Sequence, residues 1–157
     1  MIAHRSSWLR KLRQVLGNRR GSVAMEFGLL IPVLSTTVVG VTDLSLGFVR
    51  KMAVQDAAEA GAQYAALHGF SSSAISSAIT GATNLSGVSA TPAPSSSCGC
   101  ASGTSIATAT CGSTCASGQK AATYVTSSAQ YTYTMILNYP GLSNPVTLSA
   151  ATTIRIQ

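Results

Sequence analysis

The chain has 157 residues, of which 46% are hydrophobic and only 9% are charged, and its formal net charge is +6 at pH 7. All of the excess positive charge lies before position 21, since residues 22–157 carry four basic and four acidic side chains. The basic character is therefore no argument for nucleic-acid binding by residues 22–157, and we expect no nucleic-acid partner.

Residues 1–21 are predicted to be a basic cytoplasmic leader that is later cleaved. This segment has no acidic residue, and its basic residues are Arg5, Arg10, Lys11, Arg13, Arg19 and Arg20. Basic side chains beside an apolar segment stay on the cytoplasmic side of a membrane, which places residues after about 50 across it. In a secretory signal peptide the small-residue cleavage site follows the apolar core. Here Gly21 precedes the core, so cleavage after Gly21 would leave the hydrophobic helix in the product.

Residues 22–69 are predicted to form one long helix, apolar in its first half and amphipathic in its second. The part from about 23 to 49 exceeds the roughly 20 residues that span a bilayer, and its only charged residues are Glu26 and Asp43. An ionised carboxylate near hydrocarbon is costly, so Glu26 needs a partner or a role. Asp43 is expected near the opposite interface, solvated or paired with a neighbouring basic group. Pro32 should kink or loosen the helix, either as a tolerated membrane-helix proline or as a functional hinge.

The second half of this helix is predicted to pack through one face. Apolar residues recur there at intervals of three or four, a helical period. Many small residues between 57 and 66 would permit close approach of other elements, and Gly69 is a plausible helix stop. The residues predicted for the packed face are Leu46, Val49, Ala53, Ala57, Ala60, Tyr64 and Leu67.

Residues 70–157 are predicted to form a small extracytoplasmic head, which makes the fold class α+β. Helical periodicity indicates a short second helix over about 72–84, ending near Gly87. A Ser/Gly/Cys-rich loop is expected over 86–123. Alternating apolar and polar residues then predict strands at about 124–137 and 145–156, joined as an antiparallel hairpin or small sheet. Because a lone hairpin is only marginally stable, it should lie against the long helix or another strand.

The four cysteines form two closely spaced pairs, Cys98 with Cys100 and Cys111 with Cys115. Four thiols could hold zinc, but the predicted topology places them in an oxidising compartment, which favours two disulfides. Pairing between the two groups is sterically easier than closing the short ring from Cys98 to Cys100. The sequence leaves the connectivity open.

Catalytic signals are weak, and we expect neither an enzyme nor a cofactor. His4 lies in the leader and His68 ends the long helix, where it is expected to be exposed or to cap the helix. No acidic residue follows His68, so no carboxylate of the head could orient it as a base. Phosphate-binding glycine loops and clusters of carboxylates with metal-ligand spacing are lacking as well.

The residues around the predicted cleavage site carry a family resemblance. Residues 20–32, in which Phe27 follows the glutamate, resemble the processing region of TadE-like pseudopilins. These are minor pilin-like components of the tight-adherence (Flp) pilus machinery, a branch related to type IVb pilins. Residues 41–43 and 55–65 are similar to the later part of the family's helix, and residues 148–156 to its terminal strand.

The resemblance implies cleavage by a membrane aspartyl prepilin peptidase between Gly21 and Ser22. It also implies that Glu26 neutralises the new N-terminal amine of a neighbouring subunit, which would lower the cost of burying both charges. The implied partners are the peptidase, other pilin or pseudopilin subunits and the bacterial inner membrane, with the head in the periplasm. The pilus or the cell surface is a further destination after assembly. A chain longer than the usual Flp pilin resembles a minor subunit.

Two other functions remain open at this stage. The chain could be an uncleaved single-span envelope protein whose disulfide-stapled head binds a ligand or a surface. It could also be a periplasmic metal-binding module that uses the four thiols.

Overall fold

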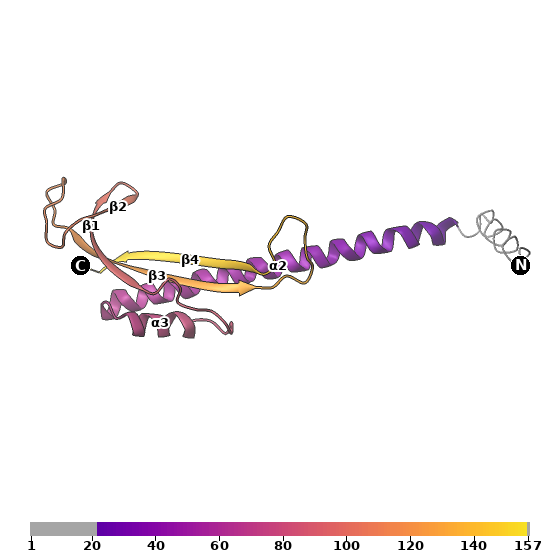
Figure 1. The fold of residues 1–157 in the computed structure, drawn as a ribbon, viewed down its shortest axis with the longest axis horizontal. Helices are drawn as coiled ribbons and strands as arrows, with labels where there is room; N and C mark the ends of the chain where they lie inside the picture. The colour runs from indigo at the N-terminus through magenta and orange to yellow at the C-terminus, as the bar shows by residue number, and fades with distance from the viewer. Residues whose placement is uncertain (1–21, 157) are drawn as a thin grey trace, which may run out of the picture. The chain divides into compact units, whose positions relative to one another are not determined.

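The computed structural model describes residues 22–156, so the predictions for the leader and for Gly21 lie outside the described residues. Two helices precede four strands: α2 (Ser22–His68), α3 (Ser72–Gly81), β1 (Ser95–Ser102), β2 (Ser105–Thr108), β3 (Ala122–Tyr133) and β4 (Val146–Arg155) (Figure 1). The predicted α+β class is confirmed. The chain divides between Thr42 and Asp43 into two compact units. Of the described residues, 22–42 belong to the first unit and 43–156 to the second.

Helix α2 has 47 residues, and its span agrees with the predicted helix to within one residue at the C-terminal end. It is helical through Pro32. The helix ends where expected, because Gly69 has a φ of +80°, a conformation that glycine adopts without steric cost. The Gly69 amide donates to the carbonyl of Ala65 at 2.9 Å.

The buried face of α2 differs from the predicted one. The buried apolar residues of this helix are Val54, Ala57, Ala58, Ala62 and Ala65. Of the predicted stripe only Ala57 is among them, and Leu67 is 81% exposed. The small residues decide the orientation, because alanine and glycine let a second helix and a sheet approach the backbone closely.

The core of the second unit joins α2, α3 and β3. Ile75 and Ile79 of α3 and Val125 and Ala129 of β3 pack with the small residues of α2. Gly61 marks the tightest approach, because a Cβ atom added there would lie 2.6 Å from Cγ1 of Ile79 and would also collide with the Ser127 hydroxyl. A close three-way contact between the helices and the sheet thus replaces a large apolar core.

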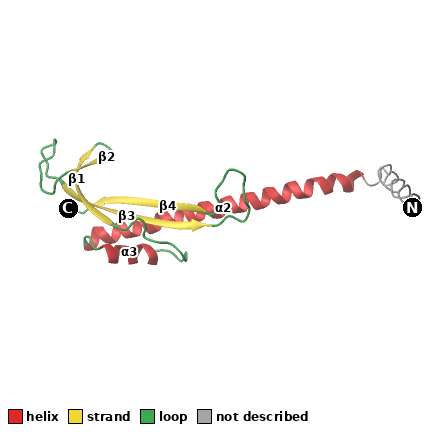
Figure 2. Cartoon of the chain, in the orientation of Figure 1, coloured by secondary structure: helices red, strands yellow, loops and turns green. Residues whose placement is uncertain are grey.

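The sheet is antiparallel throughout, with strand order β2-β1-β3-β4 (Figure 2). The predicted C-terminal hairpin is present as β3 and β4, whose register pairs Ala129 with Ala150. Lys51 of α2 donates to the carbonyl of Ser149 in β4, which satisfies a polar group on that strand.

The prediction of a loop over 86–123 is wrong in part, because β1 and β2 lie within it. Their sequences are rich in Ser, Ala and Thr and lack an apolar alternation, so the pattern that revealed β3 and β4 is missing. Most of their side chains are exposed. Pairing of β1 with β3 and of β2 with β1, rather than burial of a hydrophobic face, accounts for these strands.

Candidate functional site

The first unit presents an apolar helix surface. Residues 23–38 and 41–42 are exposed, and the large side chains among them are almost all Val, Leu, Ile, Met or Phe. Within the described residues, α2 is the one helix long and apolar enough to cross a membrane, and its most apolar 18-residue window is not buried inside the protein. A core helix of a soluble protein would be covered by its own chain, so this surface requires another environment.

The threonine hydroxyl groups in this stretch are satisfied within the helix. Thr36 donates to the carbonyls of Pro32 and Val33, each at 3.0 Å. Thr37 and Thr42 likewise donate to the carbonyls four residues earlier, at 2.8 and 2.9 Å. An unpaired hydroxyl would be costly in hydrocarbon, so these bonds make the polar residues compatible with a bilayer.

The predicted processing residues lie at the start of this helix. Ser22 is the first residue of α2, and Glu26 and Phe27 follow in its first two turns as exposed side chains. Gly21 lies outside the described residues. The residues that would follow cleavage after Gly21 are thus helical from the first described residue onward. The cleavage itself, the role of Glu26 and a kink at Pro32 remain predictions.

The prediction that Asp43 is solvated or paired with a neighbouring basic group is wrong. Its side chain is only 2% exposed, and its partners come from the end of β3 and the loop after it. Tyr133 donates its hydroxyl to Oδ1 at 2.6 Å, and the amides of Ile136 and Leu137 donate to Oδ2 at 3.0 and 3.4 Å. Neutral donors of the head, rather than a basic side chain, therefore stabilise this carboxylate.

The loop from 134 to 145 is ordered by a second polar side chain. Oδ1 of Asn144 accepts from the amide of Met135 at 3.0 Å, and its Nδ2 donates to the Met135 carbonyl at 3.2 Å. Asn144 also donates to Oδ1 of Asn138 at 2.6 Å. Sequence reasoning placed this segment at a turn but missed its attachment to Asp43, because no local pattern links positions 90 residues apart.

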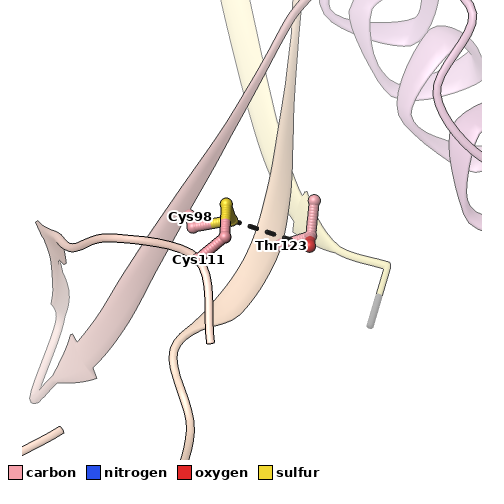
Figure 3. The surroundings of a disulfide bond; sticks show 3 residues. All are labelled: Cys98, Cys111 and Thr123. Atoms are coloured by element: carbon pink, nitrogen blue, oxygen red, sulfur yellow. Dashed lines mark hydrogen bonds between the residues drawn. A yellow bond between two sulfur atoms is a disulfide. The ribbon is translucent and has the colours of Figure 1, made fainter. Parts of the chain in front are cut away.

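The four cysteines form two disulfides, Cys98 with Cys111 and Cys100 with Cys115. Both join strand β1 to the segment after β2, which is the cross-pairing between groups that the sequence favours. Figure 3 shows the first bridge beside Thr123 of β3, whose hydroxyl lies 3.9 Å from Sγ of Cys98. The bridges tie a polar loop to the sheet, where little apolar burial is available.

Histidine and acidic groups do not gather into a site in the described part of the chain. His68 stacks on Tyr64, with ring centroids 4.4 Å apart, and its Nδ1 lies 3.2 Å from the Tyr64 carbonyl oxygen. This position at the last turn fits the predicted capping role. Residues 22–156 contain no group of three or more His, Cys, Asp or Glu side chains that could hold a metal ion.

Comparison with known families supports the sequence resemblance. Residues 21–63 match the family described as TadE-like protein. The chain is TadE-like over these residues. The match begins at Gly21, covers the exposed apolar stretch and continues into the small-residue part of α2 that packs against the head. No curated protein and no solved structure has a significant match to the chain.

Proposed function

We propose that this TadE-like chain is a minor pilin-like structural component of a Flp, or type IVb, tight-adherence pilus assembly system. The observation that carries the proposal is the overlap of the TadE-like match with an exposed apolar helix. The match begins at Gly21 and extends to residue 63, the described chain is helical from Ser22 onward, and the large apolar side chains over residues 23–38 are exposed. Removal of residues 1–21 would also remove the whole excess of positive charge.

The membrane anchor of this proposal is the stretch 23–42. It is shorter than the span predicted from sequence, because Asp43 is bonded to the head. Twenty helical residues rise about 30 Å, which matches the hydrocarbon thickness of a bilayer. With the leader in the cytoplasm, the chain is a single-pass protein of the bacterial inner membrane whose head is periplasmic. Assembly then takes the head to the pilus or the cell surface.

The part of α2 that follows the proposed span has exposed apolar side chains, which supports packing with other pilin or pseudopilin subunits. Leu44, Phe48 and Met52 are exposed and follow one another at intervals of four residues, so they share one helix face. This stripe gives the periplasmic part of α2 an apolar face against which another subunit can pack. Glu26 is assigned the role of meeting the Ser22 amine of a neighbouring subunit.

Substitution at Gly21 tests the processing step. In cells that co-produce a prepilin peptidase, the wild-type chain should shift to higher mobility on a gel as residues 1–21 are lost. Gly21→Leu should remain uncleaved, because a bulky side chain before the scissile bond keeps the backbone from the protease carboxylates. Gly28→Leu is the matched control, since nothing lies within 4 Å of a Cβ added there. Equal cleavage of Gly21→Leu and wild type would contradict the assigned site.

The uncleaved single-span alternative makes the opposite prediction. A chain that keeps its leader in the presence of active peptidase, yet is found in the inner membrane with its head periplasmic, would favour a membrane-anchored binding protein. Protease accessibility of the head in spheroplasts, read together with the gel shift, distinguishes the two functions.

A further inference from the structure

The loop between β3 and β4, residues 134–145, lies beside α2 (Figure 2). The amides of Ile136 and Leu137 attach it to Asp43 of that helix. Asp43 directly follows the stretch 23–42 that we assign to the membrane. If that stretch crosses the bilayer, chain continuity places Asp43 where the helix leaves it. The loop fixed to Asp43 must then lie at the same level, next to the outer surface of the membrane.

The amino-acid composition of the loop suits a position at the outer surface of the membrane. Residues 134–145 contain no charged side chain. Two of its large apolar side chains point outward, since Ile136 is 61% and Leu142 is 58% exposed. Neutral polar groups mixed with exposed apolar side chains are suited to the boundary between headgroups and acyl chains.

The loop is also preorganised to present these side chains. The Leu142 amide donates to the Tyr139 carbonyl at 3.2 Å across a turn with Pro140 and Gly141 at its centre. Gly141 has a φ of +85°, which a type II turn requires at that position. The side-chain bonds of Asn144 hold the ends of the loop together. Because the loop is already ordered, it loses little conformational entropy when Leu142 enters the membrane.

From this arrangement we propose that the β3–β4 loop is a second membrane contact, which inserts Leu142 and Ile136 into the outer lipid interface. The inference rests on the proposed membrane span. The occupant is the lipid interface rather than a second copy, because the attachment to Asp43 fixes the loop at the membrane boundary.

Tryptophan substitution measures the depth of each position. The chain has one natural tryptophan, Trp8 in the leader, which is replaced by Phe in every variant. Leu142→Trp reports the loop and Leu34→Trp reports the span. Leu67→Trp is the matched control, because Leu67 is also strongly exposed but lies about 36 Å from Asp43 along α2.

Each full-length variant is reconstituted in phosphatidylethanolamine and phosphatidylglycerol vesicles that contain lipid brominated either near the headgroup or near the chain ends. Leu142→Trp should lose roughly half of its fluorescence to the shallow bromines, since interfacial side chains reach about 5–10 Å into the boundary. Leu34→Trp should be quenched by the deep bromines. Leu67→Trp should be quenched by neither. Ile136→Trp repeats the loop measurement at an independent position.

The outcomes separate the loop proposal from the proposed span. Deep quenching of Leu34→Trp with no quenching of Leu142→Trp and Ile136→Trp would overturn the loop contact and leave the span in place. A blue-shifted but unquenched Leu142→Trp, as expected for burial against a second copy, would overturn it as well. An unquenched Leu34→Trp would overturn the span itself. Adding Asp43→Ala should reduce the quenching of Leu142→Trp, whereas adding Asp56→Ala, at an exposed acidic residue of α2, should not.

Discussion

The Tyr133 hydroxyl donates a 2.6 Å hydrogen bond to the carboxylate of Asp43, 90 residues earlier in the chain. The same hydroxyl lies 3.2 Å from the Asp43 carbonyl oxygen. Through this pair the end of β3 is fixed to α2 at the first residue of the head unit. The pair defines where the proposed anchor ends and the head begins.

Removal of the carboxylate should loosen this attachment. In Asp43→Ala the amides of Ile136 and Leu137 lose their acceptor, and an unpaired amide away from water is destabilising. We expect a lower melting temperature and faster proteolysis within 134–145 than in wild type. Asp56→Ala removes an exposed carboxylate from the same helix and should change neither quantity. Equal protease resistance of Asp43→Ala and wild type would show that the loop is held by other contacts.

The Asp43–Tyr133 pair should also make stability depend on pH in two opposite directions. The hydrogen bond from Tyr133 lowers the pKa of Asp43, which lies outside the proposed span, below its ordinary 3.8. This contribution is present above pH 3.8 and is lost as the pH falls through the lower folded-state pKa. The bond from Tyr133 to Asp43 raises the pKa of Tyr133 from 10.0 to about 12. Its contribution is present below pH 10 and is lost as the pH rises through about 12.

The measurement compares melting temperatures of wild type and Tyr133→Phe across this pH range. Wild type should be the more stable by a constant margin between about pH 5 and 9, and the margin should shrink on both sides. If the difference in melting temperature between wild type and Tyr133→Phe did not vary with pH, the ionisation of Asp43 and Tyr133 would not affect stability through this pair.

Gly61 should be the glycine of α2 that tolerates a side chain least. Gly61→Ala places a methyl group against Ile79 and Ser127, and overpacking of this kind costs about 1–3 kcal/mol. The higher helix propensity of alanine offsets up to about 1 kcal/mol of that loss. Gly81→Ala, at the end of α3 with nothing within 4 Å of the new Cβ, should be neutral or slightly stabilising. Denaturant unfolding followed by circular dichroism checks both variants.

The Ser127 hydroxyl offers a second test of the same contact. It is buried and makes no hydrogen bond within the described residues. Ser127→Ala removes an unsatisfied polar group, so it should be neutral or stabilising on its own. In this background Gly61→Ala should cost less than in wild type, because one of the two collisions is relieved. Additive effects of the two substitutions would contradict the close contact.

The sequence predicted these helices better than their contacts. Periodicity and Gly69 defined α2 almost to the residue, because both signals are local. The packed face was misassigned, because large residues such as Leu67 carry the strongest hydrophobic signal while alanines decide how closely the sheet approaches. Asp43 looked like an interfacial charge for a similar reason. Its partners lie beyond β3, and only the tertiary fold brings them together.

The disulfide connectivity can be checked by paired substitutions. Replacing Cys98 and Cys111 with serine removes one native bridge and should leave no free thiol in the purified chain. Replacing Cys98 and Cys115 instead removes one partner from each bridge, so thiol titration should detect Cys100 and Cys111. Four free thiols and one bound zinc ion in the wild-type chain would restore the metal-binding alternative.

The two bridges should stabilise the outer half of the sheet more than its core. Their sequence separations are 13 and 15 residues, and closing loops of this size contributes about 3 kcal/mol each. Reduction should therefore speed hydrogen exchange in β2 and the segment 109–121, while β3 stays protected by its contacts with α2. The polar sequence of β1 and β2 explains why they were predicted as loop. The pairing that holds β1 in the sheet is with β3, which lies further along the chain, and β2 pairs in turn with β1.

The intact mass of the chain after co-production with a prepilin peptidase tests the central claim most directly. Purified from the inner-membrane fraction, the protein should have the mass of residues 22–157, with Ser22 as its first residue. A catalytically inactive peptidase should restore the full-length mass. A chain that retains residues 1–21 beside the active peptidase would contradict the assignment of this TadE-like chain as a processed pilin-like subunit.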